Sequence, residues 1–326
     1  MRSAPARAGR EVDLSRAGLV LVTGATGFVG RDLLARLLAR GYRVRAAARD
    51  PSGIPERPGL EVAALPDLAL AVDLSALVAG VSDVVHLAGI AHATASIPEA
   101  RYRDVNADAS VALARASRAA GVRSFVLMSS VRAQSGPTAS RPLREADPPQ
   151  PTDAYGRSKL AAEQSVYAAL SGSGVRAVAL RPVLVHGPGV KGNLRALLRL
   201  ARLPLPLPLA GLGNKRSLVG LANLGAAIGH AIECEEVAGS YLVSDGPPVT
   251  VGEIIASLRA GLERGPGLFR APLTPLALAL RIAGRSDVWE RLAGDLVVDT
   301  SRLSATGWRP VATTAEGLAA MARASI

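Results

Sequence analysis

The feature of this chain that most constrains its fold is an apolar run that enters a glycine-rich turn and continues as a helix. Leu19 to Val22 are all apolar, residues 23–30 read TGATGFVG, and a helical pattern follows from Asp32 to Leu38. Backbone N–H groups at a helix N-terminus bind phosphate, and a strand that delivers such a turn is typical of dinucleotide-binding folds. The sequence therefore predicts a pyrophosphate site at residues 23–30.

The three glycines of this turn have separate expected tasks. Gly24 permits the tight turn, Gly27 lets the backbone approach the phosphates, and Gly30 lets the helix pack closely on the strand. Their spacing is three and three residues, where the usual fingerprint has two and three. The residues of the turn that we expect to bind the cofactor are Gly24, Thr26, Gly27, Phe28, Val29 and Gly30.

Apolar runs separated by helical segments recur in the first half of the chain, at 44–48, 84–87, 125–128 and 175–180. Runs that are apolar throughout are typical of strands buried on both faces of a parallel sheet. We therefore expect an α/β fold: a Rossmann-like, doubly wound parallel sheet with a smaller, mostly helical substrate-binding C-terminal region. The expected parts are a flexible extension at 1–17, an NAD(P)-binding domain at 18–187 that a strand near 239–244 rejoins, and the substrate-binding region at 188–326.

The end of the second predicted strand bears on the choice of cofactor. An NAD-selecting acid usually stands about 20 residues beyond the glycine turn, but this chain reads Ala48-Arg49-Asp50, with the acid displaced. Ala48 leaves room for a ribose phosphate and Arg49 can pair with it, so we expect NAD(P) with a preference for NADP. Asp50 keeps NAD open as the alternative.

A tyrosine and a lysine one helical turn apart form the predicted catalytic centre. Tyr155 and Lys159 stand at positions i and i+4 of a helical pattern, so they share one face of the helix. A lysine ammonium near the phenol favours the phenolate that proton transfer requires at neutral pH. The apolar run 125–128 ends in Ser129-Ser130, which places a hydroxyl at the carboxyl end of a parallel strand.

Composition argues against several other classes of protein. The net charge of +11 favours phosphate-bearing partners, but no basic run with interleaved aromatics occurs, so we expect no nucleic-acid partner. The four histidines and the single cysteine, Cys234, show no metal-ligand spacing. The N-terminal segment lacks the apolar core of a signal peptide, and the apolar stretch 273–284 is too short to span a bilayer. We expect a cytoplasmic protein without an integral membrane segment.

Several of these motifs together resemble one family. TGATGFVG, Ser129-Ser130 and Tyr155-Gly156-Arg157-Ser158-Lys159 are similar to motifs of the extended short-chain dehydrogenases/reductases, and within them the NAD(P)-dependent sugar-nucleotide 4-epimerases and 4-ketoreductases. The resemblance covers nearly the whole chain. Further segments that stand in the family's order are Val85-His86-Leu87-Ala88-Gly89, Val105-Asn106, Leu180-Arg181-Pro182 and Gly307-Trp308-Arg309-Pro310.

The resemblance implies specific roles. Tyr155 becomes the acid/base, Lys159 the group that binds the nicotinamide ribose and tunes Tyr155, and Ser130 the hydroxyl that polarises the sugar C4 oxygen. Ser130 is preferred to Ser129 because the family's hydroxyl stands 25 positions before its tyrosine. The further cofactor contacts that it implies are Asp67, Leu68, Leu87, Ala88, Gly89 and Pro182, and the implied diphosphate contacts are Asn193 and Arg216.

The implied function is a 4-epimerase or 4-keto-sugar reductase of a nucleotide-diphosphate sugar, which we expect to act as a homodimer. The chain departs from the family pattern at 132–136, which lacks the usual tyrosine before the glycine, and at Asn223, where an acid is common. Both departures concern substrate identity. The alternatives are an NADP-dependent ketone reductase of another substrate class and a dinucleotide-sensing module without catalysis.

Overall fold

The computed structural model describes residues 18–67, 70, 72–91, 97–272, 274, 281, 282, 284, 289 and 293–325. The predicted extension at 1–17, the predicted cofactor contact Leu68 and most of the apolar stretch 273–284 lie outside these residues. Among the described residues, no helix combines the length and the apolar character that crossing a membrane requires.

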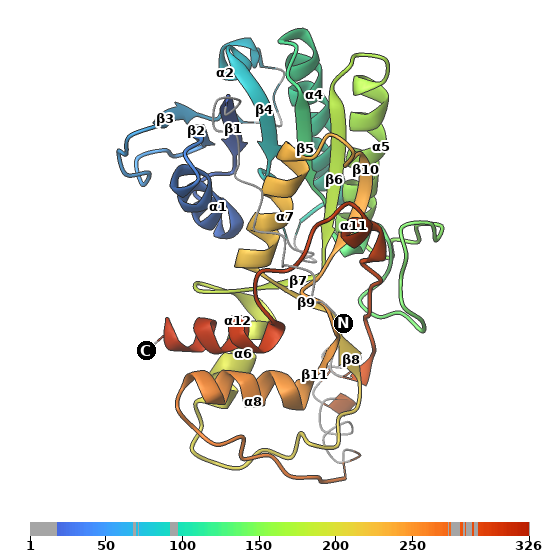
Figure 1. The fold of residues 1–326 in the computed structure, drawn as a ribbon. Helices are drawn as coiled ribbons and strands as arrows, with labels where there is room; N and C mark the ends of the chain where they lie inside the picture. Colours follow the sequence, from blue (N-terminus) through green and yellow to red (C-terminus); the bar gives the residue numbers. More distant parts are fainter. Residues whose placement is uncertain are drawn as a thin grey trace, which may run out of the picture.

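Seven parallel strands form the central sheet, in the order β10-β6-β5-β4-β1-β2-β3 (Figure 1). The chain runs outwards from β1 to one edge and then returns to build the other half. The strands are β1 (Leu19–Thr23), β2 (Arg43–Ala48), β3 (Leu60–Ala64), β4 (Val81–His86), β5 (Ser124–Met128), β6 (Arg176–Pro182) and β10 (Gly239–Val243). This order is doubly wound, and the predicted Rossmann-like α/β fold is confirmed.

Two layers of helices cover the sheet because its central strands are apolar on both faces. Val20 and Val22 of β1 pack in one core with helices α1 (Phe28–Ala39) and α7 (Leu221–Glu233). Leu19 and Leu21 face the other core, with α4 (Ala109–Ala119) and α5 (Ala154–Leu170). Alternate residues of each strand thus bury into opposite layers, as the uninterrupted apolar runs predict.

Polar residues within strands explain where sequence patterns and structure differ. β4 begins at Val81, because Asp83 is buried and accepts hydrogen bonds from Arg123 and Ser124 rather than ending the strand. β3 has no apolar run, since it forms the sheet edge and leaves much of its surface exposed, including Val62 at 45%. A half-exposed edge strand carries too weak a pattern to be recognised from apolar runs.

The region after β6 contains two small two-stranded sheets and several helices below the main sheet in Figure 1. β7 (Leu184–His186) pairs with β9 (Leu218–Gly220), and β8 (Lys215–Arg216) pairs with β11 (Val249–Thr250). The helices below the sheet are α6 (Gly192–Ala201), α8 (Val251–Gly261) and α12 (Thr314–Arg323), while α11 (Ser301–Ala305) lies beside β10. Helices α6, α8 and α12 share an aliphatic core of their own. Shorter elements elsewhere are α2 (Ser75–Val78), α3 (Glu99–Tyr102), η2 (Arg103–Asp108) and η3 (Val131–Ala133).

The close packing of α8 on α12 gives a test of this distal core. A Cβ added to Gly261 would lie 2.2 Å from the Ala319 carbonyl oxygen, whereas one added to Gly265 would meet nothing within 4 Å. Gly261→Ala should therefore lower the free energy of unfolding by about 1–3 kcal/mol, because the two backbones must separate. Gly265→Ala is the matched control in denaturant unfolding, and equal effects of the two changes would contradict the packing.

Candidate functional site

The glycine turn between β1 and α1 is built for close backbone approach. Gly24 has a φ of 69°, in the left-handed region, and an added Cβ would lie 2.8 Å from the Ala88 backbone nitrogen. A Cβ on Gly30 would lie 2.3 Å from the Gly24 carbonyl oxygen. Gly27 caps α1 without a side chain, and no acidic residue stands in the first turn of α1. This arrangement fits the pyrophosphate of a dinucleotide at the helix N-terminus.

The segment after β4 lies against this turn. The backbone nitrogen of Ala88 donates to Thr23 Oγ1 at 3.3 Å, and that of Leu87 donates to the Thr23 carbonyl at 3.3 Å. A Cβ on Gly89 would lie 2.6 Å from Asn106 Oδ1 and 3.5 Å from Lys159 Nζ. The segments that follow β1 and β4 carry small side chains, and their backbones lie against each other. Together they form one continuous surface, the glycine cradle, which reaches the predicted catalytic lysine.

The buried amide of Asn106 holds that cradle to α5. Its Oδ1 accepts from the Ile90 backbone nitrogen at 2.8 Å, and its Nδ2 donates to Ser158 Oγ at 3.0 Å. Both bonds hold the loop after β4 against α5, so the amide of Asn106 has a structural role. A side chain that braces the β4 loop against α5 sets the distance between the cofactor cradle and the helix of Tyr155.

The end of β2 presents a small residue and two exposed charges. Ala48 is buried, and Arg49 and Asp50 are exposed. Asp50 Oδ1 accepts from the backbone nitrogen and the hydroxyl of Ser52, at 3.0 and 2.6 Å, and these bonds hold the pKa of Asp50 below its usual value. Asp50 is therefore occupied by its own turn. The carboxylate Oδ2 of Asp67, a predicted cofactor contact, lies 3.8 Å from Arg101 Nη2.

The predicted catalytic side chains meet at the carboxyl end of β5. Asp153 caps α5 by accepting from the Gly156 backbone nitrogen at 2.7 Å, which fixes the first turn that carries Tyr155. Ser130 caps η3, and its side chain is hydrogen-bonded to Tyr155. Ser130, Tyr155 and Lys159 are all buried. The i, i+4 spacing thus brings Tyr155 and Lys159 to the serine and the cradle.

The electrostatic setting of Tyr155 differs from the simple sequence picture. Burial raises the pKa of Tyr155, and the hydrogen bond with Ser130 opposes this. The charges that act on the phenol are Asp153, which raises its pKa, and Arg132, which lowers it. Lys159 Nζ instead donates to the Met128 carbonyl at 2.9 Å. Activation of the phenol by Lys159 stays a prediction, and Arg132 emerges as a neighbouring cation.

The ammonium of Lys159 is itself perturbed. Burial lowers the pKa of Lys159 to about 8, and the Glu163 carboxylate opposes that shift. The pKa of His86 falls to about 3, because of burial first and the Lys159 charge second, so His86 is neutral. A neutral His86 sits 2.7 Å from Thr23 Oγ1 and is available as a structural partner of the turn rather than as a cation.

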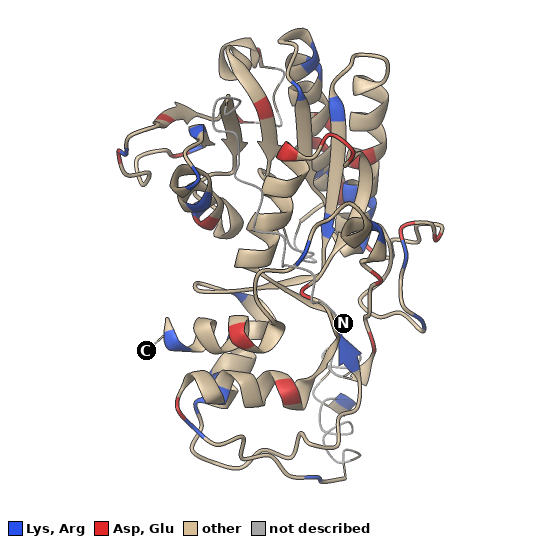
Figure 2. Ribbon diagram, viewed as in Figure 1, with Lys and Arg blue, Asp and Glu red and all other residues tan. Residues whose placement is uncertain are grey.

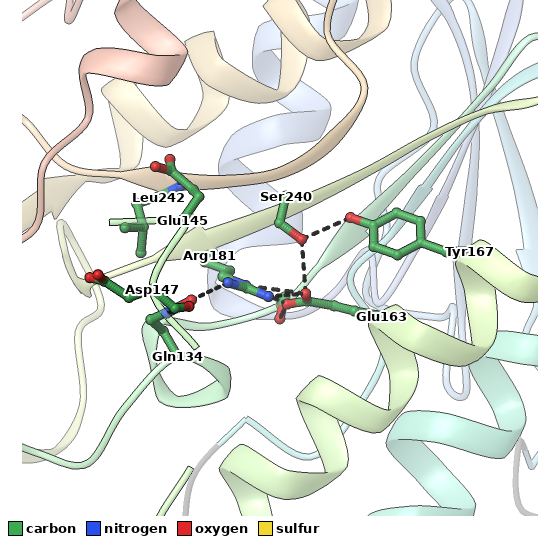
Figure 3. A network of polar contacts seen from close by, with 9 residues as sticks. Gln134, Glu145, Asp147, Glu163, Tyr167, Arg181, Ser240 and Leu242 are labelled. Atoms are coloured by element: carbon green, nitrogen blue, oxygen red, sulfur yellow. Dashed lines mark hydrogen bonds and ion pairs between the residues drawn. The ribbon is translucent and has the colours of Figure 1, made fainter. Parts of the chain in front are cut away.

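A buried carboxylate connects the catalytic turn to the sheet. Glu163 of α5 accepts from Arg181 of β6, with Nε at 2.9 Å from Oε1 and Nη2 at 2.5 Å from Oε2 (Figure 3). Ser129 Oγ also donates to Glu163, and Ser240 Oγ of β10 donates to Oε2 at 2.9 Å. The sequence motifs include Ser129 and Arg181, but they do not predict that these side chains meet Glu163. A charged residue inside the apolar β6 was the signal available, since such a residue needs a buried partner.

The same network extends to the loop before α5. Arg181 Nη1 donates to Gln134 Oε1, and Gln134 Nε2 donates to the Asp147 carbonyl at 2.7 Å. Figure 3 shows Arg181 lying between Glu163 and Gln134. Gln134 belongs to the segment that departs from the family's tyrosine-glycine pattern, and here it anchors the loop.

The predicted substrate residues lie in the distal region. Asn193 is exposed at the second position of α6, and Arg216 lies in β8 with Nη1 3.5 Å from the Pro137 carbonyl. Pro182 ends β6, opposite Val243. Asn193 lies in α6 and Arg216 in β8, and their shared role in diphosphate binding stays a prediction.

Asn223, which replaces a common acid, has a structural role. Its Nδ2 donates to Asp245 Oδ1 at 2.6 Å, and its Oδ1 accepts from the Val311 backbone nitrogen at 2.7 Å. Asp245 also accepts from the Gly220 backbone nitrogen at 2.7 Å. Asn223 therefore ties the C-terminal segment to the ends of β9 and β10. An amide suits this place because it must both donate and accept.

The site can perform proton transfer beside a bound dinucleotide. The part of the chain that the structure describes contains no cluster of three or more His, Cys, Asp or Glu that could hold a metal ion. Basic residues are spread over the sheet region and the distal region rather than gathered in one stripe (Figure 2). The chemistry that the geometry offers is therefore that of a phenol, a serine hydroxyl and an ammonium at the mouth of a parallel sheet.

Comparison with known proteins defines the class of this chain. The model of the NAD dependent epimerase/dehydratase family matches residues 20–239. A UDP-glucose 4-epimerase from Vibrio cholerae is 34% identical, over 94% of this chain and 94% of its own length. The chain belongs to the NAD-dependent epimerase/dehydratase family and is an enzyme of that family. The resemblance to extended short-chain dehydrogenases/reductases is confirmed.

Two further relatives show the range of the fold. The structure of MoeE5 in complex with UDP-glucose and NAD has a TM-score of 0.73 and 25% identity, and the match covers 94% of this chain and 98% of MoeE5. A 3-diazoavenalumate denitrifying reductase from a Streptomyces species is 30% identical, over 89% of this chain and 95% of its own length. Both an NAD-bound protein with a UDP-sugar and a reductase of another compound are thus similar to this chain along most of its length.

The Glu163–Arg181 pair gives a prediction about stability. Glu163→Gln removes the charge that compensates the buried guanidinium, so the free energy of unfolding should fall by about 3–5 kcal/mol. Glu61, whose side chain is 38% exposed and pairs with Arg43 and Arg45, is the control. Glu61→Gln should cost about 1 kcal/mol or less. Denaturant unfolding measures both, and a small loss in both variants would show that the buried pair is not a structural anchor.

Proposed function

We propose that this enzyme acts at C4 of a nucleotide-diphosphate sugar, as a 4-epimerase or a 4-keto-sugar reductase. The observation that carries the proposal is the convergence of Ser130, Tyr155 and Lys159 at the carboxyl end of β5, beside the glycine cradle that reaches Lys159. The relative from Vibrio cholerae supports the substrate class, since it is a UDP-glucose 4-epimerase and its similarity to this chain extends over 94% of both lengths.

Each side chain has a defined task in this proposal. Tyr155 gives a proton to the C4 oxygen on reduction and takes it back on oxidation, and Ser130 donates a hydrogen bond to the same oxygen. Lys159 holds the nicotinamide ribose through its buried ammonium. The cofactor, when bound, supplies the hydride chemistry. Burial of Tyr155 keeps the phenol protonated at neutral pH, which suits the donor step of a reduction.

Binding of the nucleotide diphosphate falls to the distal region. Arg216 is the stronger candidate, because a guanidinium can hold a diphosphate through two parallel bonds. Asn193 can contribute an amide from the first turn of α6. A homodimer in the cytoplasm completes the proposal, and sedimentation of the purified protein would test the dimer.

A second candidate is a ketone reductase that acts on another substrate class. The similarity to the Streptomyces reductase along 89% of this chain favours it. Asn223, at a position where an acid is common, belongs to the C-terminal anchor and leaves the substrate open. An uncharged substrate would leave Arg216 without a task in binding, so the nucleotide-sugar proposal is preferred.

A panel of UDP- and dTDP-sugars and their 4-keto forms, with NADH and NADPH, tests the proposed function. At least one nucleotide sugar should be epimerised or reduced. Tyr155→Phe should lower that turnover by about 10²–10⁴-fold while cofactor binding survives, because the ring stays and the transferable proton is lost. Turnover of non-nucleotide ketones alone would favour the second candidate. No turnover with any compound would favour a dinucleotide sensor, and near-normal activity of Tyr155→Phe would remove Tyr155 from the mechanism.

The preference for NADP is tested at the end of β2. Arg49 is exposed there, and the Asp50 carboxylate accepts two hydrogen bonds from Ser52 within its own turn. NADPH should bind more tightly than NADH, and Arg49→Ala should weaken NADPH by about ten- to a hundredfold through the loss of a charge-assisted bond. NADH binding should stay nearly unchanged. Equal affinities for the two cofactors in the unmodified protein, measured by calorimetry, would contradict the preference and favour an epimerase.

A further inference from the structure

Two short segments that carry the catalytic hydroxyls are held together by Arg132 and Asp153. Arg132 Nη2 lies 2.6 Å from Asp153 Oδ2, and Asp153 Oδ1 accepts from the Gly156 backbone nitrogen at 2.7 Å. The backbone nitrogen of Arg132 donates to Ser130 Oγ at 3.1 Å. One ion pair therefore connects the turn of Ser130 with the first turn of the helix that carries Tyr155.

The backbones of these segments also touch directly. A Cβ added to Gly156 would lie 2.3 Å from the Arg132 carbonyl oxygen and 3.1 Å from its carbonyl carbon. A side chain at 156 would push the η3 turn away from α5. The distance between Ser130 and Tyr155 is thus set by a close backbone contact and by the ion pair beside it.

Solvent screens the charge of the Arg132 guanidinium only weakly, because most of the side chain is buried. Its side chain is 18% exposed and that of Asp153 is 29% exposed, and the Nη1 atom of Arg132 is buried without a hydrogen-bond partner. A buried guanidinium nitrogen without a partner is unusual and calls for an explanation. A charge in such a place acts on its neighbours more strongly than a surface charge does.

We propose that Arg132 is a positioning residue of the reaction: paired with Asp153, it fixes Ser130 against α5 and places a positive charge beside the Tyr155 phenol. This inference rests on the proposed role of Tyr155 in proton transfer. The groups that act on the Tyr155 phenol are Ser130, Asp153, Arg132 and Tyr102, whose ring packs edge-on against it, with Lys159 one turn further along α5. Burial raises the pKa of Tyr155, Asp153 raises it further, and Arg132 lowers it.

Neutralising Arg132 and neutralising Asp153 should shift the pKa of Tyr155 in opposite directions. Arg132→Gln removes the cation, so Tyr155 should ionise at a higher pH, by about one pH unit. Asp153→Asn keeps an acceptor for the Gly156 cap but removes the anion, so Tyr155 should ionise at a lower pH by a similar amount. At a fixed pH the phenolate fraction then changes about tenfold in opposite directions. Arg132→Lys keeps a cation at this position, so its pH–rate profile should stay close to that of the unmodified protein.

The pH dependence of kcat/KM is the first readout. In the reductive direction the alkaline limb of Tyr155 lies above that of Lys159, whose pKa is about 8, and the Tyr155 limb should move up in Arg132→Gln and down in Asp153→Asn. A merely structural clamp would lower activity in both variants without moving this limb in opposite directions. Arg157→Gln is the matched control, since Arg157 lies on the same helix and pairs with the exposed Glu99. That variant should leave the profile in place, and a shift as large as that of Arg132→Gln would overturn the proposal.

A direct titration separates this inference from the proposed function. The difference in ultraviolet absorbance between each variant and its Tyr155→Phe counterpart reports ionisation of this phenol alone and needs no turnover. Opposite shifts in an inactive protein would support the pair and count against the proposed enzyme activity. Turnover of a nucleotide sugar with unshifted or same-sign profiles would overturn the pair and leave the proposed function standing.

Discussion

The buried carboxylate of Glu163 is the interaction on which the arrangement of the site depends. It accepts hydrogen bonds from Arg181 of β6, from Ser129 at the end of β5 and from Ser240 of β10, and it lies on the same helix as Tyr155. A carboxylate buried between a helix and an apolar sheet is costly unless it is paired and hydrogen-bonded, so these partners must keep their positions. Helix α5 is therefore locked to three neighbouring strands at the level where the predicted chemistry takes place.

Two further sets of contacts attach neighbouring segments to helix α5. Asn106 ties the loop after β4 to Ser158 of α5, which brings the glycine cradle to Lys159. Arg132 and Asp153 tie the turn of Ser130 to the start of α5. The site is thus assembled from the carboxyl ends of β1, β4 and β5 around one helix, which is where parallel α/β sheets place their ligands.

The sequence predicts the parts of this structure that rest on local pattern. Uninterrupted apolar runs identify the central strands, and the glycine turn, Tyr155 and Lys159 identify the site, because these features depend on neighbouring residues. The buried pair Glu163–Arg181 and the half-buried pair Arg132–Asp153 each join residues about 20 positions apart through the tertiary fold, and no local pattern predicts which partner each charge meets. The sequence pattern does not predict β3 for a different reason, since an exposed edge strand is not uniformly apolar.

The central claim is that hydrogen leaves and rejoins C4 of a nucleotide sugar at this site. A single turnover of a nucleotide sugar deuterated at C4, with the oxidised cofactor and stoichiometric protein, tests it by mass spectrometry and NMR. The account predicts that the deuterium is recovered on the nicotinamide, or on sugar C4 in the inverted configuration, with none in the solvent. Deuterium that is lost to water, or that stays on C4 with the cofactor and configuration unchanged, would contradict it.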